Sequence, residues 1–389
     1  MRKMQLILWP VVMFVLLCLI GCDEDSKDDE SNLDTILPSS FKVDIPDALS
    51  NNVQLKSASS DTLQGSDVYR NMNGFIYVGE SAAEIVSEIM AAIKKYELGS
   101  SMEITYISED DNREKRLVVV ENASYQNESW EHQLTIADVE SEGNDDEGKA
   151  MQVFWNSSPV QGIAVMKPYN LDRESNANEQ ETMYRIDYTE VADDNYDRQM
   201  TVYIEGFPGQ RSDVYHMTNM KLFAGRKGEY IDVVGTSIHP NAFIFLIDQR
   251  GFAWTFIGSS DRNEELGVAQ VALPPHTLDE SDKDTLMEKY SMYNVMYSQA
   301  EQIVKAWLTL EYGPLWLDKV NDKQWFKDTL NKHLDPYLAD VKSPGYFNDG
   351  GYVSAGTAPS DDFLTISERF DVLSPYNPKV VNDLSIEFK

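Results

Sequence analysis

The chain has 389 residues, of which 42% are apolar and 25% are charged, and this composition is typical of a protein with a large folded core. Its 65 acidic and 33 basic residues give a net charge of −32. A surface this acidic repels phosphate backbones, which argues against nucleic-acid binding because such binding needs a basic face.

The first 21 residues have the three parts of an export signal. The sequence MRK gives a positive start, an uncharged apolar run follows, and Gly21 stands directly before Cys22. The apolar run is nearly long enough to cross a membrane, but Pro10 within it and the cysteine at its end argue against a permanent span. We therefore predict that residues 1–21 are a removable signal peptide.

The stretch LIGC, which ends at Cys22, resembles the lipobox of bacterial lipoproteins. That resemblance implies cleavage between Gly21 and Cys22, followed by acylation of the Cys22 sulfur and amine. Two or more acyl chains hold a protein stably on a membrane, whereas one chain does not. The second cysteine, Cys18, lies in the removed segment, so we expect no disulfide within the mature chain.

Residues 22–38 are acidic and polar, with too few apolar side chains to fold, so they are predicted to be an extended tether. An acidic run just after the lipid-bearing cysteine resembles the surface-export signal of Bacteroidota lipoproteins. The resemblance implies an outer-membrane protein exposed at the cell surface. In enterobacteria an aspartate at the position of Asp23 would instead imply retention at the inner membrane, and a periplasm-facing protein remains the alternative.

Within the tether, Asp34, Thr35 and Ile36 match the short O-glycosylation motif of Bacteroidota proteins, which makes Thr35 the candidate acceptor. Three-residue motifs recur by chance in so acidic a chain. The match therefore predicts a modification site without indicating a function.

The folded part begins with a predicted strand at 41–45 and a second at 74–79, followed by a helix at 80–99. From 101 to 273 apolar residues alternate with polar ones, and Asp, Asn and Gly separate the runs. Successive hairpins of this kind predict an antiparallel meander of around a dozen strands, which would curve strongly or close. The sequence does not decide between an open sheet and a barrel.

The pattern changes at 279, where no Gly or Pro occurs until Gly313, and this predicts one helix over 279–312. Its inward side is predicted to comprise Leu286, Tyr290, Tyr293, Tyr297, Ala300, Val304 and Trp307. A shorter helix is predicted at 322–341, a loop-rich stretch at 343–362 and a last strand at 384–389.

These elements predict an α+β fold in which one N-terminal helix and a long C-terminal helix pack on a large curved antiparallel sheet. We expect one domain over 39–389, mainly β over 39–275 and helical and loop-rich over 276–389. No internal repeat and no second linker indicates a further boundary.

Motifs for catalysis or cofactor binding are missing from the sequence. It has no nucleophile elbow, no Walker loop, no dinucleotide fingerprint and no H-E-x-x-H helix, and its five histidines are scattered. Asp193, Asn195 and Asp197 alternate like calcium ligands, but Arg198 and Ile204 stand where a calcium loop needs Gly and Glu. We therefore predict no catalytic residue, no metal site and no cofactor.

Aromatic residues are densest between 307 and 352, which makes this region the candidate ligand site. Flat rings beside amide and carboxylate groups suit the faces and hydroxyls of sugars, and loops commonly carry binding residues. The predicted ligand-binding residues are Trp325, Tyr346, Phe347, Asn348, Asp349 and Tyr352. The alternative is that the tryptophans pack the helices onto the sheet and that the other rings fix the loop.

The sequence therefore favours a lipid-anchored, non-enzymatic envelope protein that binds a glycan, a peptide or another envelope protein outside the cell. One alternative is a hydrolase of an extracellular polymer that uses two carboxylates. Because the chain has 65 acidic residues, the sequence does not indicate which two these would be. The other is a carrier of an apolar ligand in the concavity of the sheet, since a curved sheet around helices is similar to the architecture of bacterial lipoprotein carriers.

Overall fold

The computed structural model describes residues 41–50, 65–95, 101–207, 215–242 and 250–389. Gly21, Cys22, Thr35 and the predicted tether at 22–38 lie outside the described residues.

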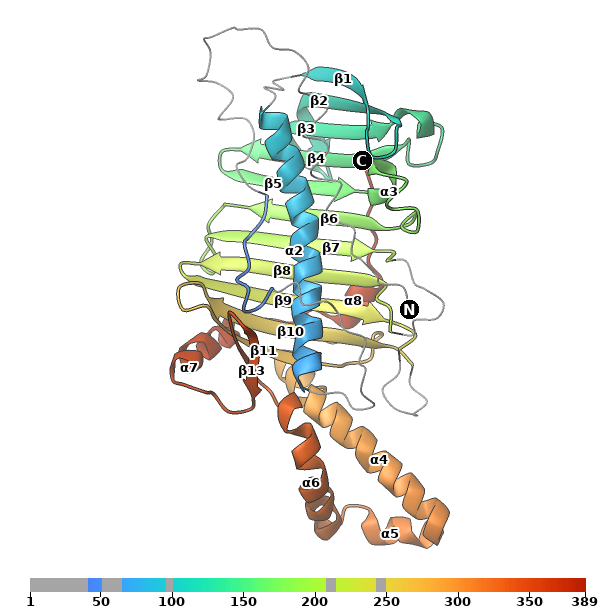
Figure 1. Cartoon of the computed structure of the whole chain (residues 1–389), viewed down its shortest axis with the longest axis vertical. Coiled ribbons are helices and arrows are strands. Elements are labelled where there is room, and N and C mark those ends of the chain that lie inside the picture. Colours follow the sequence, from blue (N-terminus) through green and yellow to red (C-terminus); the bar gives the residue numbers. More distant parts are fainter. Residues whose placement is uncertain (1–40, 51–64, 96–100, 208–214, 243–249) are drawn as a thin grey trace.

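A 13-stranded antiparallel sheet forms the body of the molecule, and each strand pairs with the next strand in the chain (Figure 1). The sheet begins at β1 and ends at β13, which do not pair with each other. The predicted mixture of helices with a large antiparallel meander is therefore confirmed, and the sheet is open. The strands are β1 (Met102–Ile107), β2 (Glu114–Tyr125), β3 (Glu128–Asp138), β4 (Lys149–Ser157), β5 (Val160–Met166), β6 (Met183–Thr189), β7 (Arg198–Glu205), β8 (Asn219–Lys227), β9 (Tyr230–His239), β10 (Phe252–Asp261), β11 (Leu266–Ala272), β12 (Gly345–Asn348) and β13 (Gly351–Ala355).

Tight turns set the register of the hairpins. Between β2 and β3 the two turn residues, Gln126 and Asn127, have φ of 52° and 67°, the left-handed backbone that a two-residue hairpin turn requires. Tyr125 consequently pairs with Glu128, and the ladder continues from there to Lys115 and Asp138.

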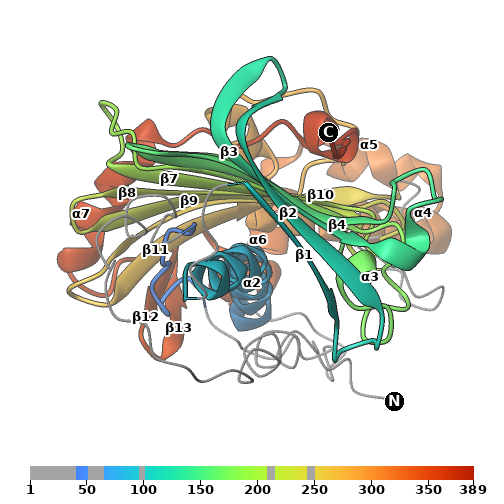
Figure 2. The same ribbon diagram turned by 90° about the horizontal axis from the view of Figure 1, so that it is seen from above.

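Helix α2 (Gly65–Lys95) crosses one face of the sheet, as Figures 1 and 2 show. Its 31 residues span about 46 Å at the usual rise per residue. The side chains buried against the sheet recur at helical spacing and are Val68, Tyr69, Met72, Ile76, Ala83, Val86 and Met90. The predicted strand at 74–79 is wrong, because this stripe runs through it and those residues form the middle of the helix.

A glycine allows α2 to approach the sheet closely. A Cβ atom added at Gly79 would lie 2.5 Å from the Cδ2 atom of Leu222 on β8, so a larger residue would require the Leu222 side chain or the helix to shift. This contact lies within the main core, where Leu222 is fully buried.

Residues 41–50 lie beside α2, and the predicted strand at 41–45 is wrong. The segment is not paired with any strand of the sheet. Its backbone donors bond to α2 instead, since the Phe41 amide donates to Ser87 Oγ at 3.0 Å and the Ile45 amide donates to Glu80 Oε1 at 3.1 Å. Phe41 is fully buried, so the segment contributes to the core through its side chains.

The C-terminal residues cover the opposite face of the sheet (Figure 2). They form α7 (Asp362–Ser367), the 3₁₀ helix η6 (Glu368–Val372) and α8 (Pro378–Asn382). Arg369 anchors η6 through an ion pair with buried Asp232, 2.6 Å between nitrogen and oxygen. The predicted strand at 384–389 is wrong, because this end crosses the strands instead of pairing with them, and Tyr125 donates a hydrogen bond to the carbonyl of Glu387.

The predicted single helix over 279–312 is also wrong. A π-helical turn, η3 (Thr285–Lys289), ends before α4 (Met292–Tyr312) begins. Ser291 interrupts the helix because its side chain caps α4, accepting a hydrogen bond from the Asn294 amide at 3.3 Å. Only the start of α4 reaches the main core, through Met292 and Met296, so the predicted packing of a long C-terminal helix on the sheet is not found.

The chain then turns through η4 (Pro314–Trp316) and α5 (Leu317–Val320) and returns along α6 (Gln324–Leu338), which confirms the shorter predicted helix. After η5 (Ala339–Val341) it forms β12 and β13, where a loop-rich stretch was predicted at 343–362. Two further short elements, η2 (Val139–Ser141) and α3 (Pro168–Leu171), flank the strands near β3 and β4.

Candidate docking surface on a helical arm

Residues 292–338, which we call the arm, extend beyond the end of the sheet as a helical hairpin (Figure 1). The arm has a small core of its own, in which Val320, Phe326 and Leu330 are buried. Side chains from α4, η4 and α6 pack around these three residues, namely Tyr297, Val304, Leu308, Trp316 and Leu334. The arm is therefore a separately packed unit attached to the sheet at its base.

A tyrosine fastens the two long helices of the arm at that base. The Tyr293 hydroxyl on α4 donates a hydrogen bond to Asp335 on α6 at 3.0 Å. Burial and the nearby Asp335 carboxylate together raise the pKa of Tyr293 to about 12, so its hydroxyl keeps its proton and remains a donor.

Five large apolar side chains are exposed where α4 ends, where the chain turns and where α6 begins. Their exposed fractions are 87% for Leu310, 77% for Leu315, 54% for Trp307, 53% for Tyr312 and 52% for Trp325. We call these five residues the docking surface. Soluble proteins rarely expose apolar side chains in groups of this kind unless the groups bind something, so this is the candidate functional site.

The local sequence explains why these side chains point outward. Gly313 ends α4 with a φ of 84°, its amide donating to the Thr309 carbonyl, and Pro314 starts η4 at once. The sharp reversal leaves Leu310 and Leu315 on either side of the turn, while Trp316 and Val320 fill the interior. Sequence reasoning placed Trp307 on the inward side of a helix, and this was wrong because the arm has few partners to bury it.

Two rings of the docking surface meet at a steep angle. Trp307 and Tyr312 have centroids 6.0 Å apart and planes at 86°. Edge-on rings do not present one flat platform for a sugar ring to stack on. These rings and the two exposed leucines instead project separately from the surface as individual apolar side chains.

Charge is nearly balanced on the arm, which has six acidic and five basic residues in a chain whose net charge is −32. Exposed carboxylates stand among the apolar residues: Glu311 lies between Leu310 and Tyr312, and Asp318 and Asp322 follow the turn. Placing ionised carboxylates in the apolar layer of a membrane is costly, so this arrangement favours a protein surface over a bilayer.

The structure separates the residues that the sequence predicted as one ligand site. Tyr346 and Phe347 are 3% and 0% exposed, and they pack against Phe363 and Tyr69 at ring distances of 5.3 and 5.5 Å. Tyr352 is half-buried and stacks on Tyr69 at 5.4 Å. These tyrosine and phenylalanine rings fix the β12–β13 hairpin on the sheet.

The remaining predicted ligand residues are exposed but lie apart. Asn348 and Asp349 form the turn of the hairpin, where both accept hydrogen bonds from the Gly350 amide. Trp325 lies in the first turn of α6, about 20 Å along that helix from its end at Leu338. Trp325 is thus part of the docking surface, whereas the two leucines of that surface were missed and only the Gly-Pro turn after α4 could have indicated them.

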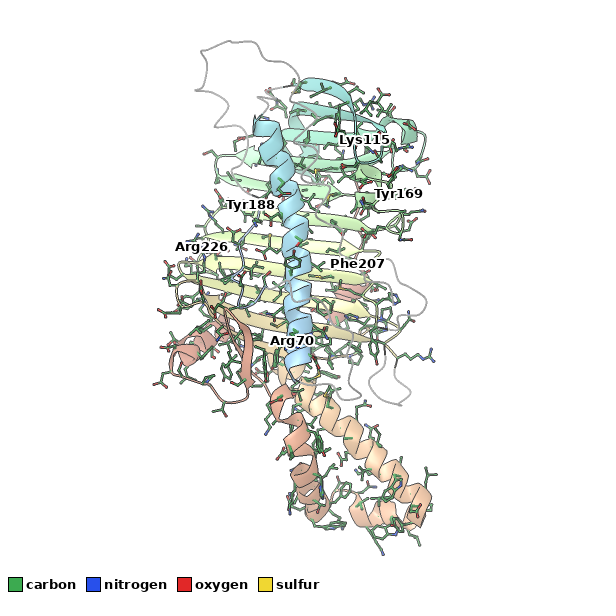
Figure 3. All side chains as sticks on the ribbon, viewed as in Figure 1. Arg70, Lys115, Tyr169, Tyr188, Phe207 and Arg226 are labelled. Atoms are coloured by element: carbon green, nitrogen blue, oxygen red, sulfur yellow. The ribbon has the colours of Figure 1, made fainter. Side chains whose placement is uncertain are left out.

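A buried cluster of charges joins the β1–β2 turn to β3 and α3. Lys115 lies 2.9 Å from Asp111 and 3.6 Å from Asp138, and Arg173 bonds to Asp138 at 2.9 Å while covering the Tyr169 ring at 4.5 Å. Figure 3 places Lys115 on β2 and Tyr169 on α3 at one side of the sheet. Each of the four charged side chains named here has an opposite partner, so they hold these segments together.

One buried pair has the geometry of a nucleophile and a base. The Ser237 hydroxyl lies 2.9 Å from His239 Nε2, and His239 Nδ1 lies 2.8 Å from the Tyr215 carbonyl. Ser237 is 0% exposed, and the imidazole of His239 packs against the rings of Phe75 and Phe252. A substrate cannot reach this hydroxyl in the structure, so the pair satisfies the polar groups of a buried strand.

The acidic turn that resembles a calcium loop uses its carboxylates to accept backbone hydrogen bonds from itself and from the neighbouring β8–β9 turn. Asp193 accepts hydrogen bonds from the Asn195 and Tyr196 amides, and Asp197 accepts one from the Gly228 amide. Among the residues that the structure describes, no group of three or more His, Cys, Asp or Glu side chains is arranged to hold a metal ion.

Within the described ranges, no helix combines the length and the apolar character that crossing a membrane requires. In comparisons with known proteins, no family model, no curated protein and no solved structure matches this chain.

Proposed function

We propose that this protein is a non-enzymatic, lipid-anchored envelope protein that binds another protein through the docking surface on its arm. The observation that carries the proposal is the exposure of Leu310 and Leu315, at 87% and 77%, at the end of a unit that projects from the sheet. Exposed large apolar and aromatic residues in one group are typical of the centre of a protein–protein interface.

The chemistry of the docking surface favours a protein over a glycan or a lipid as the occupant. Leucine side chains offer a sugar no hydrogen bond, and the steep angle between Trp307 and Tyr312 gives it no flat platform. The exposed carboxylates of Glu311 and Asp318 oppose insertion into a membrane.

We infer that the partner has an apolar groove with charged groups of both signs at its rim. The groove would receive Leu310 and Leu315, and the rim would face Glu311, Asp318 and Asp322 together with Lys319 and Lys323. The net charge of −32 would attract a cationic partner at long range and speed the encounter.

The anchor rests on the sequence LIGC and the acidic tether that follows it. We propose that Cys22 carries the lipid and that the protein is held at the outer membrane and exposed at the cell surface. A Cys22→Ala variant should be found in the soluble fraction after cell lysis. Retention of this variant in the membrane at the size of the mature wild-type protein would overturn the proposed anchor.

The partner can be found and tested in two steps. A photoreactive amino acid replaces Leu315 in the full chain, the crosslinked protein is identified in the cells that produce it, and that protein is purified. Its affinity is then measured for the wild-type chain and for the double variant Leu310→Ser, Leu315→Ser, which should bind at least about tenfold more weakly because two central apolar contacts are lost.

Leu364 provides a matched control, since it is 52% exposed on α7, away from the arm. Leu364→Ser should bind the partner as the wild type does, and both variants should unfold at the wild-type temperature. Unchanged affinity of the double variant would reject the proposed function, and so would crosslinks at Leu315 that reach only lipid or glycan.

A further inference from the structure

The first strand of the sheet has an unpaired edge. β1 pairs with β2 along its six residues, and within the described part of the chain no strand lies on its other side. The Ser108 amide donates to the Arg113 carbonyl at 2.8 Å. In an antiparallel pair, residues that bond to the partner strand alternate with residues whose backbone groups point away from it. Glu103, Thr105 and Ile107 consequently direct their N–H and C=O groups away from β2, toward the open edge.

The apolar core face of the sheet continues to this edge, where its side chains are less buried than those on β2. Ile104 lies opposite Leu117, which is 6% exposed, yet Ile104 itself is 37% exposed. Met102 and Tyr106 lie on the same side of the strand and are only half-buried. β1 contains no lysine or proline, the residues that usually protect an edge strand from pairing with another chain.

The edge carries an excess of negative charge. Residues 101–121 include six acidic and three basic side chains. All three basic side chains already have acidic partners: Arg113 with Asp138 at 2.7 Å, Lys115 with Asp111 at 2.9 Å, and Arg116 with Glu142 at 2.7 Å.

Glu103 is the acid best placed to meet an incoming strand. Its side chain is 63% exposed, and its nearest basic neighbour, Arg116, is 3.9 Å away. A strand that adds to β1 would therefore meet an apolar row on one side and a carboxylate on the other.

We propose that β1 accepts an extended segment of a partner polypeptide, in which apolar residues alternate with lysine or arginine, as an additional strand of the sheet. The backbone of the segment bonds to Glu103, Thr105 and Ile107, its apolar side chains continue the row of Met102, Ile104 and Tyr106, and its basic side chains face Glu103. A second copy of this chain fits less well because it would bring the same acidic excess to the edge. The site lies at the opposite end of the molecule from the arm (Figure 1).

The probe is a fluorescent peptide of about eight residues, long enough for a typical strand, in which lysine and valine alternate. Its binding to the full mature chain is measured by fluorescence anisotropy at physiological salt. A second peptide of the same sequence carries N-methyl groups on alternate residues, which removes backbone donors and leaves the charge unchanged. The proposal requires the first peptide to bind and the N-methylated one to bind at least about tenfold more weakly, because the interface depends on backbone hydrogen bonds.

Two substitutions at one position provide the matched variants. Thr105→Pro removes an N–H that points outward, so it leaves the β1–β2 ladder intact while blocking the new one, and it should weaken binding about tenfold or more. Thr105→Val keeps the N–H and should bind like the wild type. Circular dichroism of both variants checks that the sheet still folds.

Three results would overturn the proposal. They are equal binding of the two peptides, which would indicate attraction by charge alone; unchanged binding to Thr105→Pro; and a dimer of the wild-type chain, detected by analytical ultracentrifugation, that Thr105→Pro dissociates. The last result would assign the edge to a second copy of this chain. None of them bears on the docking surface, which is tested with other variants.

Discussion

The ammonium of Lys115 lies 2.9 Å from the carboxylate of Asp111, and both side chains are only 1% exposed. Lys115 also donates a hydrogen bond to the Asn170 carbonyl at 2.9 Å and lies 3.6 Å from Asp138. One buried cation thus connects the β1–β2 turn, the end of β3 and helix α3. A buried charge is tolerated only when opposite charges and hydrogen bonds surround it. Removing Lys115 would therefore leave its partner carboxylates buried without a compensating charge.

Replacing Lys115 with methionine should destabilise the fold strongly. The substitution keeps the length of the side chain but leaves Asp111 buried without its cation, and breaking a buried ion pair costs about 3–5 kcal/mol. The free energy of unfolding, measured with urea, should fall by that amount.

An exposed ion pair provides the control. Lys379 lies 3.0 Å from Asp279, and their side chains are 49% and 65% exposed. Lys379→Met should change the free energy of unfolding by no more than about 1 kcal/mol, because exposed pairs are screened by water and salt. Similar losses for the two variants would show that the buried cluster is not a source of stability.

Replacing Gly79 with valine should overpack the contact between α2 and the sheet and destabilise the fold. Even a Cβ atom at this position would lie 2.5 Å from Leu222 Cδ2 and 3.1 Å from Met220 Cε, and overpacking of this kind costs about 1–3 kcal/mol. Urea unfolding measures the loss. Gly143→Val is the matched control, since a Cβ atom there would meet nothing within 4 Å, and an equal loss in that variant would contradict the proposed close contact.

The sheet could be predicted from the sequence because short stretches of sequence determine its strands and turns. Strands such as β6 and β7 alternate buried and partly exposed residues, and residues that suit tight turns, such as Gln126 and Asn127, separate neighbouring strands. Whether the sheet closes depends on the accumulated twist of all its strands, which no single stretch encodes.

Helix α2 shows why the N-terminal part could not be predicted in the same way. The stretch 74–79 is short, apolar and bounded by glycines, which is typical of a strand. Only the longer pattern that joins Val68 and Met72 to Ile76 and Ala83 indicates a helix, and its glycine at 79 is explained by the approach to Leu222. Contacts with residues distant in sequence therefore overrode the local preference.

The candidate site could be predicted only in part, for a related reason. Composition identified an aromatic region, but burial decides the role of each ring: Tyr346 and Phe347 fill the core, whereas Trp325 is 52% exposed. Leu310 lies in a predicted helix and Leu315 directly after the Gly313-Pro314 turn, and neither position indicates exposure because the sequence does not show that α4 leaves the sheet.

Loss of the arm's own core should unfold the arm and leave the sheet intact. Phe326 is 6% exposed and belongs to a cluster separate from the main core, so Phe326→Ala should cost the arm about 3–5 kcal/mol through the cavity it leaves. Hydrogen exchange followed by mass spectrometry should show faster exchange over residues 292–338 and unchanged exchange in α2. Trp325→Ala, at an exposed neighbouring position, should leave both regions unchanged, and faster exchange throughout the Phe326→Ala chain would contradict a separately packed arm.

The β1–β2 turn should give stability an unusual dependence on pH. Burial, with the negative charges of Asp172 and Asp111 nearby, raises the pKa of Asp110 from 3.8 to about 6. Between these values the folded chain binds a proton at Asp110 that the unfolded chain does not, so this residue's contribution to stability is lost as the pH rises. Asp110→Asn stays neutral at every pH, and its free energy of unfolding relative to the wild type should therefore increase between pH of about 4 and about 7 and then level off.

Asp146 provides a comparison, because its pKa is shifted in the opposite direction to that of Asp110. Burial alone would raise the pKa of this carboxyl, but hydrogen bonds from Lys167 and Asn170 outweigh that effect and hold its pKa below the ordinary value. Its ionised form therefore stabilises the fold at neutral pH, and that contribution is lost as the pH falls through the lowered pKa. Asp146→Asn should be less stable than the wild type at neutral pH, with the deficit shrinking in acid. Urea unfolding of both variants over a pH series distinguishes the two effects, and differences that change with pH in the same direction would contradict the opposite environments of the two carboxyls.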